Sequence, residues 1–299
     1  MKASTHTEIY RRFDGTLERR RLRFLPLAVA GIRVAFKRKL PALLLLTPSA
    51  IGAIVASFLV HLKFTVEAGD VPGVDLRTTG MVAQMAGQLL AVSNQIVSFL
   101  LNTRLFALLV VAWYGAGLFA EDKRLGAHLL YFSRPITRLD YFLGKFGTVS
   151  FYGACSFLFP TLTILSVASF SSPDWSFVTE KGDVIIKAIA YATLWILVLS
   201  TLALAVSSLV DRKTLALVAF VGLFLLTEAV GNVMTRIADS AYWSLLSLTR
   251  NFERVADWLF DRPPEFEVAV GYSLATIAVW VAVALVVTAR RLRGMEVVA

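Results

Sequence analysis

The chain contains one cysteine, Cys155, and three histidines among its 299 residues. A single cysteine excludes an intramolecular disulfide and a cysteine-based metal site. The histidines, His6, His61 and His128, lie far apart and lack the spacing of metal ligands. We therefore expect no metal site, and we expect Cys155, which lies within an apolar run, to be a small packed side chain.

The sequence also lacks the motifs of nucleotide sites and of nucleophilic enzymes. No G-x-x-x-x-G-K-[ST] loop occurs, and "LGKFG" at Leu143–Gly147 has neither the upstream glycine nor the hydroxyl of that motif. No G-x-S-x-G context for a nucleophile is present. We therefore predict that the chain has no cofactor or ATP site of its own and is not an enzyme by itself.

Charged residues are scarce and apolar ones abundant. Only 17% of the residues are charged, 57% are hydrophobic and the mean hydropathy is +0.68. Soluble domains usually contain roughly 45–50% apolar residues, so this excess predicts a polytopic membrane protein. We attribute the net charge of +9 to basic cytoplasmic segments beside anionic membrane lipid, and we do not expect a nucleic-acid partner.

Six apolar stretches have about the 20 residues that a membrane-spanning helix needs. They are Leu40–Leu62, Ile96–Ala120, Gly147–Phe170, Val184–Ser208, Thr214–Gly231 and Val268–Thr288. We predict an all-α integral membrane protein, with a cytoplasmic segment at 1–39 and a six-span domain at 40–299. Pro48 and Pro160 lie within two of these stretches and predict local bends.

The distribution of lysine and arginine predicts the orientation. If the N-terminus is cytoplasmic, the inside segments Met1–Lys39, Glu121–Phe146, Asp211–Lys213 and Ala289–Ala299 hold 11, 5, 2 and 3 of the 30 Lys and Arg residues. Because basic residues favour the cytoplasmic side, we predict that both termini are cytoplasmic.

The segment before the first stretch, "LPLAVAGIRVAFKRKL", alternates apolar and basic residues at roughly helical spacing. This pattern predicts an amphipathic elbow helix lying in the inner membrane interface. The alternative is that it extends the first span. Pro41 favours a break between the two.

Three charged residues lie within or near the spans. A charged side chain inside the membrane costs free energy, so such residues often have a function. Glu228 would lie about 21 Å from the inner end of its helix, at ~1.5 Å per residue. It either faces the bundle interior, as part of a substrate path, or is an interfacial carboxylate solvated from outside. We expect Arg104 and Lys187 to lie near outer helix ends and to extend toward the interface. The connection at 232–267 predicts one or two short outer helices, partly re-entrant.

The inner connection, "EDKRLGAHLLYFSRPITRLDYFLGKF", is much longer than the other one, "VDRKT". It predicts a short helix along the membrane face, ended by Pro135. This helix would have one face of Leu125, His128, Leu129 and Phe132 and another of Lys123, Arg124, Ala127 and Arg134. Thr137 would then cap a second helix, with Asp140 as its capping-box partner. Such a segment would dock a cytoplasmic partner, and the alternative is an ordinary polar loop.

The same connection resembles a known family. The residues that carry the resemblance are Glu121, Gly126, Ser133–Arg138, Tyr141, Gly144 and Lys145. With "YRRFDG" at Tyr10–Gly15 and the six-span layout, they resemble bacterial ABC transporter permeases of the type-2 export family. The resemblance covers nearly the whole chain, but its motifs are diffuse.

This resemblance implies a permease subunit in the bacterial inner membrane, coupled to a separate ABC ATPase that binds ATP and Mg. It implies that the connection is a coupling helix, with docking residues Glu121, Arg124, Gly126, Arg134 and Arg138. It also implies a second permease copy, as a homodimer or a heterodimer, and a path formed chiefly by the first, second and fifth spans. Two other functions remain open: a membrane enzyme acting on lipid-like substrates, and a non-transporting membrane scaffold.

Overall fold

The computed structural model describes residues 22–36, 39–67, 91–127, 131 and 136–294. Every regular element in these residues is helical, and six helical segments are long and apolar enough to cross a membrane. They are Leu43–Val66, Val92–Arg124, Arg138–Ser171, Gly182–Leu209, Lys213–Ile237 and Val270–Arg293. The predicted all-α, six-span fold is therefore confirmed.

The spans consist of the following helices. The first contains α2 (Lys39–Glu67), the second α4 (Val92–Gly115) and α5 (Leu118–Arg124), and the third α7 (Arg138–Gly153), the π-helical turn η1 (Ala154–Leu158) and α8 (Phe159–Ser171). The last three are α10 (Gly182–Leu209), α11 (Lys213–Ile237) and α13 (Val270–Arg293). Shorter elements are α1 (Phe24–Phe36), η2 (Pro173–Trp175), α9 (Ser176–Glu180), η3 (Ala241–Leu246) and α12 (Leu248–Leu259).

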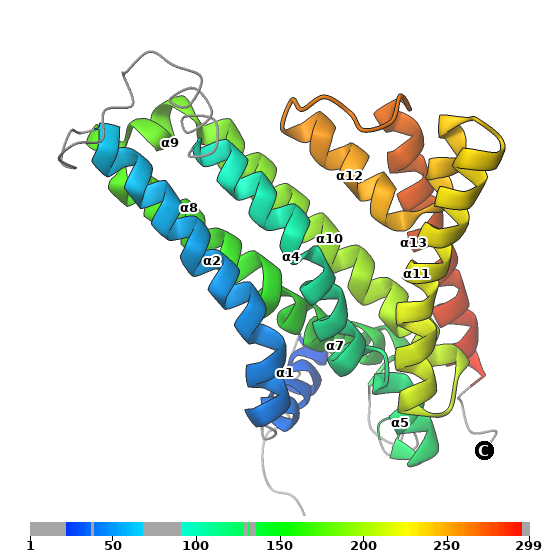
Figure 1. Cartoon of the computed structure of the whole chain (residues 1–299). Helices are drawn as coiled ribbons and strands as arrows, with labels where there is room; N and C mark the ends of the chain where they lie inside the picture. Colours follow the sequence, from blue (N-terminus) through cyan, green and yellow to red (C-terminus); the bar gives the residue numbers. More distant parts are fainter. Residues whose placement is uncertain (1–21, 37–38, 68–90, 128–130, 132–135, 295–299) are drawn as a thin grey trace, which may run out of the picture.

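The long helices form a bundle with two distinct ends. Figure 1 shows α2, α4, α8 and α10 side by side at one slant, with α11 and α13 beside them at another. Helices α1 and α5 and the last turns of α13 lie at one end, and α9 and α12 lie at the other. We call these the α5 end and the α12 end.

Helix α10 occupies the centre of the bundle, where it packs against α4, α7, α11 and α13. Within the most apolar 18-residue stretch of each span, 67% of the residues are buried in α10. The same share is 22% in α2 and α11 and 17% in α13. The outer helices expose aliphatic side chains such as Leu44, Ile54, Leu226 and Val279. In a membrane protein, such surfaces suit contact with lipid tails, which are as apolar as leucine, or with another spanning helix.

Helix α1 is separate from α2, as predicted, and packs closely on α7. A Cβ at Gly31 would lie 2.6 Å from Thr148 Oγ1, and one at Gly144 would lie 2.6 Å from Leu27 Cδ2. The hydroxyl of Tyr152 donates a hydrogen bond to the Ile32 carbonyl at 2.7 Å. These small-residue contacts let the two helices approach closely and fix α1 to the bundle.

The three prolines considered above have different settings. Pro41 lies in the first turn of α2, where its missing N–H removes no helical bond. Pro48 lies inside α2, which is helical throughout. Pro160 directly follows the π-helical turn η1, so the irregularity predicted for the third span occurs just before this proline.

Helix α12 reaches deep into the bundle from the α12 end. Its N-terminus is capped by Ser247, whose Oγ accepts from the Arg250 N–H at 3.3 Å. The ring of Phe252 packs edge-on against Trp195, with centroids 4.4 Å apart. Trp195 lies 13 residues into the 28-residue α10, so α12 reaches about half the length of this central helix. This agrees with the predicted short helices in the 232–267 connection.

Candidate functional site

The inner connection begins with a glycine turn. Helix α5 ends at Arg124, and Gly126 adopts φ 65°, a left-handed conformation that glycine accommodates readily. Ala127 and Tyr131 are helical again beyond this turn. The prediction of one helix containing both Lys123 and Ala127 is therefore wrong, because the Gly126 turn interrupts it. His128, Leu129, Phe132, Arg134 and Pro135 lie outside the described residues.

The start of α7 confirms the predicted capping box. Thr137 Oγ1 accepts from the Asp140 N–H at 3.1 Å, and Asp140 Oδ2 accepts from the Thr137 N–H at 3.1 Å. Two backbone donors that the helix leaves unpaired are thereby satisfied. This cap fixes the point at which the chain enters the third span.

A buried charge pair joins α5 to α7. The Lys145 Nζ lies 2.7 Å from Asp122 Oδ2, and the Tyr141 hydroxyl donates to the same oxygen at 2.6 Å. The side chains of Lys145 and Asp122 are only 10% and 13% exposed. The ammonium also lies 5.6 Å and 5.7 Å from the ring centroids of Tyr131 and Tyr141. We call Asp122, Tyr131, Tyr141 and Lys145 the tyrosine-caged pair.

The two charged side chains of the caged pair are largely buried, which favours a fixed geometry. Burial and the nearby Asp122 carboxylate raise the pKa of Tyr131, so its hydroxyl stays protonated at neutral pH. Sequence reasoning missed Asp122 entirely and singled out Tyr141 and Lys145 only through the family resemblance. The one available sign was an acid and a lysine flanking the same connection, which does not reveal pairing.

Helix α10 holds α5 from the other side. The Ser207 Oγ accepts from the backbone N–H groups of Phe119 and Ala120, at 2.9 Å and 3.1 Å. These donors belong to the first turn of α5, whose preceding residue, Gly117, has no side chain to cap them. Lys123 Nζ donates to the Ser208 carbonyl at 2.8 Å. Helix α5 is therefore attached to two spans, α7 and α10.

The predicted docking residues fall into two groups. Glu121 is half-buried and Arg124 is exposed on α5, and neither forms an ion pair with another described residue. Gly126 forms the turn that ends this surface. Arg138 begins α7 but lines a groove against α13, away from this group. The surface formed by Glu121 and Arg124 is named the α5 surface below.

A second charged site lies within the bundle. Arg104 lies 12 residues after the start of α4, or about 18 Å along the helix. Its Nη2 forms an ion pair with Glu253 Oε1 of α12, and both side chains are 20% exposed. The prediction that Arg104 extends toward the outer interface is therefore wrong. Lys187, in contrast, lies near the start of α10, where it pairs with Asp183 at 3.2 Å and Asp261 at 3.0 Å.

Arg104 and Glu228 line the same cavity, of about 220 Å³, between α4, α10, α11 and α12. Glu228 lies 15 residues after the start of α11, roughly 22 Å along it, and forms no ion pair with another described residue. Its position favours the bundle-interior alternative over a carboxylate on the outer surface. Apolar side chains form the rest of the wall, chiefly Leu105, Leu108, Val221, Phe224 and Leu225.

Two donors at this cavity lack partners. Among the described residues, Arg104 Nη1 and Trp195 Nε1 are buried without a hydrogen-bond partner. Buried polar groups are usually satisfied, and those that are not often mark a site for water or a ligand. We call the lining of Arg104, Trp195, Phe224 and Glu228 the bundle cavity. Its lining residues include a carboxylate, a guanidinium and an indole beside apolar side chains.

Metal binding and known relatives were the remaining sources of a functional assignment. Within the part of the chain that the structure describes, no group of three or more His, Cys, Asp and Glu could hold a metal ion. No protein-family model matches the chain, and no curated protein sequence matches it. The case for a function therefore rests on the residues themselves.

The second span connects the two sites. It runs as one apolar segment from Val92 to Arg124, with a short irregularity at Ala116 and Gly117 between α4 and α5. Arg104 and Glu121 are 17 residues apart on this span, roughly 26 Å along a helix. The second span therefore carries a residue of each site.

Proposed function

We propose that this chain is the membrane-spanning permease subunit of an ATP-driven exporter of the ABC type-2 export family, working with a separate ATPase subunit. The observation that carries the proposal is that one span bears both the α5 surface and the Arg104 side of the bundle cavity. A transport subunit needs this link between a partner-facing surface and an internal binding site. A passive scaffold has no need of it.

In this proposal, the α5 surface docks the ATPase on the cytoplasmic side of a bacterial inner membrane. Glu121 and Arg124 offer one charge of each sign, and neither is engaged by another described side chain. The caged pair and Ser207 hold α5 on α7 and α10. A displacement of α5 by the ATPase would therefore also displace α7 and α10, because these contacts join α5 to both helices.

The bundle cavity is the proposed substrate site of this half of the transporter. Its apolar wall suits the hydrophobic part of an amphiphile, and Glu228, Arg104 and Trp195 suit a polar group. A second permease, either another copy of this chain or a related one, completes the path. The ATPase subunit supplies ATP and Mg binding, for which this sequence has no motif.

The test is reconstitution of the chain in proteoliposomes with an ATPase subunit that copurifies with it from its native membrane. We expect a stable complex whose ATP hydrolysis accompanies vectorial movement of an amphiphile. ATP hydrolysis without movement of any amphiphile would favour the scaffold. Turnover of a lipid-like compound by the isolated chain would favour the membrane enzyme. Either result would overturn the permease assignment.

A further inference from the structure

Glu228 carries a charge for which the bundle provides no counter-ion. Its carboxylate forms no ion pair or hydrogen bond with another described residue, although it lines the bundle cavity. Nine residues of α11 follow it, about 14 Å of helix, so it lies well inside this span. A charged side chain in the membrane interior costs free energy unless a partner or water reaches it. Glu228 therefore marks a place where a cation would bind favourably.

The charges at the bundle cavity sum to one negative charge. Arg104 and Glu228 are the charged residues among its described lining. Arg104 already forms an ion pair with Glu253, so its positive charge is balanced before Glu228 is counted. Two carboxylates thus accompany one guanidinium, and the complementary occupant is positively charged.

The cations on the neighbouring helices do not supply this charge. Arg250 and Arg254 of α12 both contact the segment 266–268: the first lies 5.5 Å from a ring centroid, and the second donates to a carbonyl at 2.6 Å. Lys187 of α10 is paired with two aspartates. Arg236 of α11 lies eight residues after Glu228, about 12 Å along the helix. None of these four cations lines the cavity.

The rest of the lining favours an organic cation over a metal ion. Metal ions such as Ca²⁺ and Mg²⁺ take about six to eight oxygen ligands, and no group of three or more metal-ligating side chains occurs in the part of the chain that the structure describes. Trp195 and Phe224 line the cavity, and aromatic rings attract ammonium groups. Its volume of about 220 Å³ is below the roughly 300–1,000 Å³ of pockets for drug-sized ligands, so a single ring with a short chain suits it.

We infer that the bundle cavity selects cationic amphiphiles. An ammonium group pairs with Glu228 through charge-assisted hydrogen bonds, and the hydrocarbon body lies against Phe224 and the aliphatic side chains of the wall. An anionic amphiphile is disfavoured, because it would bring a second negative charge to an unpaired carboxylate. The inference rests on the proposed function only where it makes this cation the transported substrate.

The test uses three probes that share one skeleton and differ in charge: 4-phenylbutylamine, which is protonated at neutral pH, 4-phenylbutanol and 4-phenylbutyrate. Binding of each radiolabelled probe to the full-length chain in phosphatidylcholine nanodiscs is measured by scintillation proximity, and binding to empty nanodiscs is subtracted. Glu228→Gln removes the charge and keeps the shape of the side chain. Glu180→Gln is the matched control, because it removes the same charge from an exposed residue of α9 outside the cavity lining.

We expect the wild type to bind the amine about tenfold more tightly than the alcohol, and the butyrate more weakly than either. Glu228→Gln should weaken binding of the amine about tenfold and leave binding of the alcohol nearly unchanged, whereas Glu180→Gln should behave like the wild type. Equal affinity of the wild type for amine and alcohol, unchanged binding of the amine by Glu228→Gln, or an equal loss in the control would overturn the inference.

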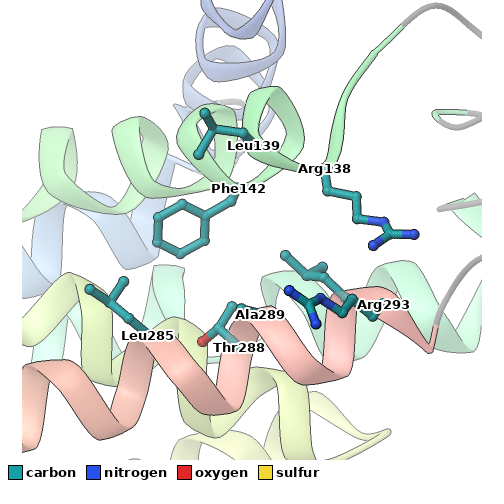
Figure 2. Close-up of a pocket in the computed structure, with 8 residues that line it drawn as sticks. Arg138, Leu139, Phe142, Leu285, Thr288, Ala289 and Arg293 are labelled. Atoms are coloured by element: carbon teal, nitrogen blue, oxygen red, sulfur yellow. The ribbon is translucent and has the colours of Figure 1, made fainter.

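A second pair of variants tests the location. Val221→Phe adds a ring to the cavity lining and keeps Glu228. Ala289→Phe adds the same ring to a separate groove between α7 and α13, which Figure 2 shows with Arg138 and Arg293 among its lining. Binding of the amine should fall about tenfold in Val221→Phe and stay unchanged in Ala289→Phe. No loss in the first variant, or equal losses in both, would place the amine outside the bundle cavity and contradict the inference.

These measurements separate the charge preference from the permease assignment, because binding needs no ATPase. Glu228-dependent binding of the amine by a chain whose ATPase complex moves no amphiphile would overturn the permease assignment and support the charge preference. ATP-driven transport of an anionic or uncharged amphiphile, by a chain that shows no preference for the amine, would overturn the charge preference and support the permease.

Discussion

Two of the ion pairs among the described residues join helices through largely buried side chains, and they differ in what surrounds them. The Asp122–Lys145 pair is enclosed by Tyr131 and Tyr141, and Tyr141 donates to the carboxylate. The Arg104–Glu253 pair borders a cavity and leaves a guanidinium nitrogen unpaired among the described residues. A fully enclosed pair fixes geometry, whereas a partly satisfied one beside a cavity has bonding capacity left for a ligand. The first pair is structural in our account and the second is functional.

The largest expected effect is on the caged pair. Lys145→Met removes the Lys145 cation from the buried Asp122 carboxylate, and we expect a loss of about 3–5 kcal/mol of unfolding free energy. Asp122→Asn/Lys145→Met removes both charges and should recover most of this loss. The measurement is denaturant unfolding of the purified chain, with the exposed Lys181→Met as the matched control. A loss below about 1 kcal/mol, as for a surface pair, would contradict the structural role.

The next effect separates folding from transport at the bundle cavity. Glu228→Gln keeps the shape of the side chain and removes its charge, so unfolding should be nearly unchanged. Transport per inserted protein should fall about tenfold if the carboxylate contacts the substrate. Reconstituted transport and thermal unfolding are measured on the same samples. Glu228→Leu with wild-type transport would remove this residue from the mechanism.

Arg104→Met should behave differently from Glu228→Gln, because Arg104 has both roles. It leaves Glu253 without its partner, so we expect a loss of about 2–3 kcal/mol of unfolding free energy as well as impaired transport. Arg104→Met/Glu253→Gln should restore stability without restoring transport. Recovery of both properties in the double variant would make this pair purely structural and would weaken the comparison.

A smaller effect is expected at the α5 surface. Glu121→Ala and Arg124→Ala should reduce substrate-stimulated ATP hydrolysis in the complex by about two- to tenfold without changing insertion, because each removes one charged contact at an interface. Lys181→Ala, an exposed cation near the α12 end, is the control. Unchanged coupling in both variants would remove the docking role from this surface.

The smallest effect concerns Asp257 of α12. Burial raises the pKa of this carboxyl, which is only partly offset by Arg262, whose Nε lies 3.9 Å away. An acid with a raised native pKa lowers stability as pH rises through that range, because the charged form is disfavoured in the folded protein. Asp257→Asn should therefore raise the unfolding midpoint by about 2 °C at neutral pH and have no effect in acid, where the aspartate is protonated. Equal shifts at both pH values would contradict a titration effect.

Local patterns predicted much of this molecule. Apolar runs identified all six spans, and the Thr137–Asp140 spacing identified the start of α7, because each depends on residues close together in the chain. The depth of Arg104 was missed because the second span was expected to begin at Ile96, whereas α4 begins at Val92. Its partner, Glu253, lies 149 residues away on a helix whose path into the bundle depends on packing against Trp195.

The caged pair shows the same limit in another form. Asp122 and Lys145 both lie in the inner connection, yet their pairing depends on the Gly126 turn and on the angle between α5 and α7. Neither the charge nor the composition of this connection determines the angle between α5 and α7. Ser207, which caps α5 from α10, depends in the same way on how two spans cross.

The most direct test of the permease account is to find which end of the bundle meets the ATPase. A photo-reactive residue is placed at position 124 on the α5 surface and, in a second protein, at exposed position 258 of α12, in cells that express the proposed ATPase partner. The account predicts that the ATPase subunit is captured from position 124 and not from position 258. Capture from position 258, or from neither position in a complex that still hydrolyses ATP, would contradict it.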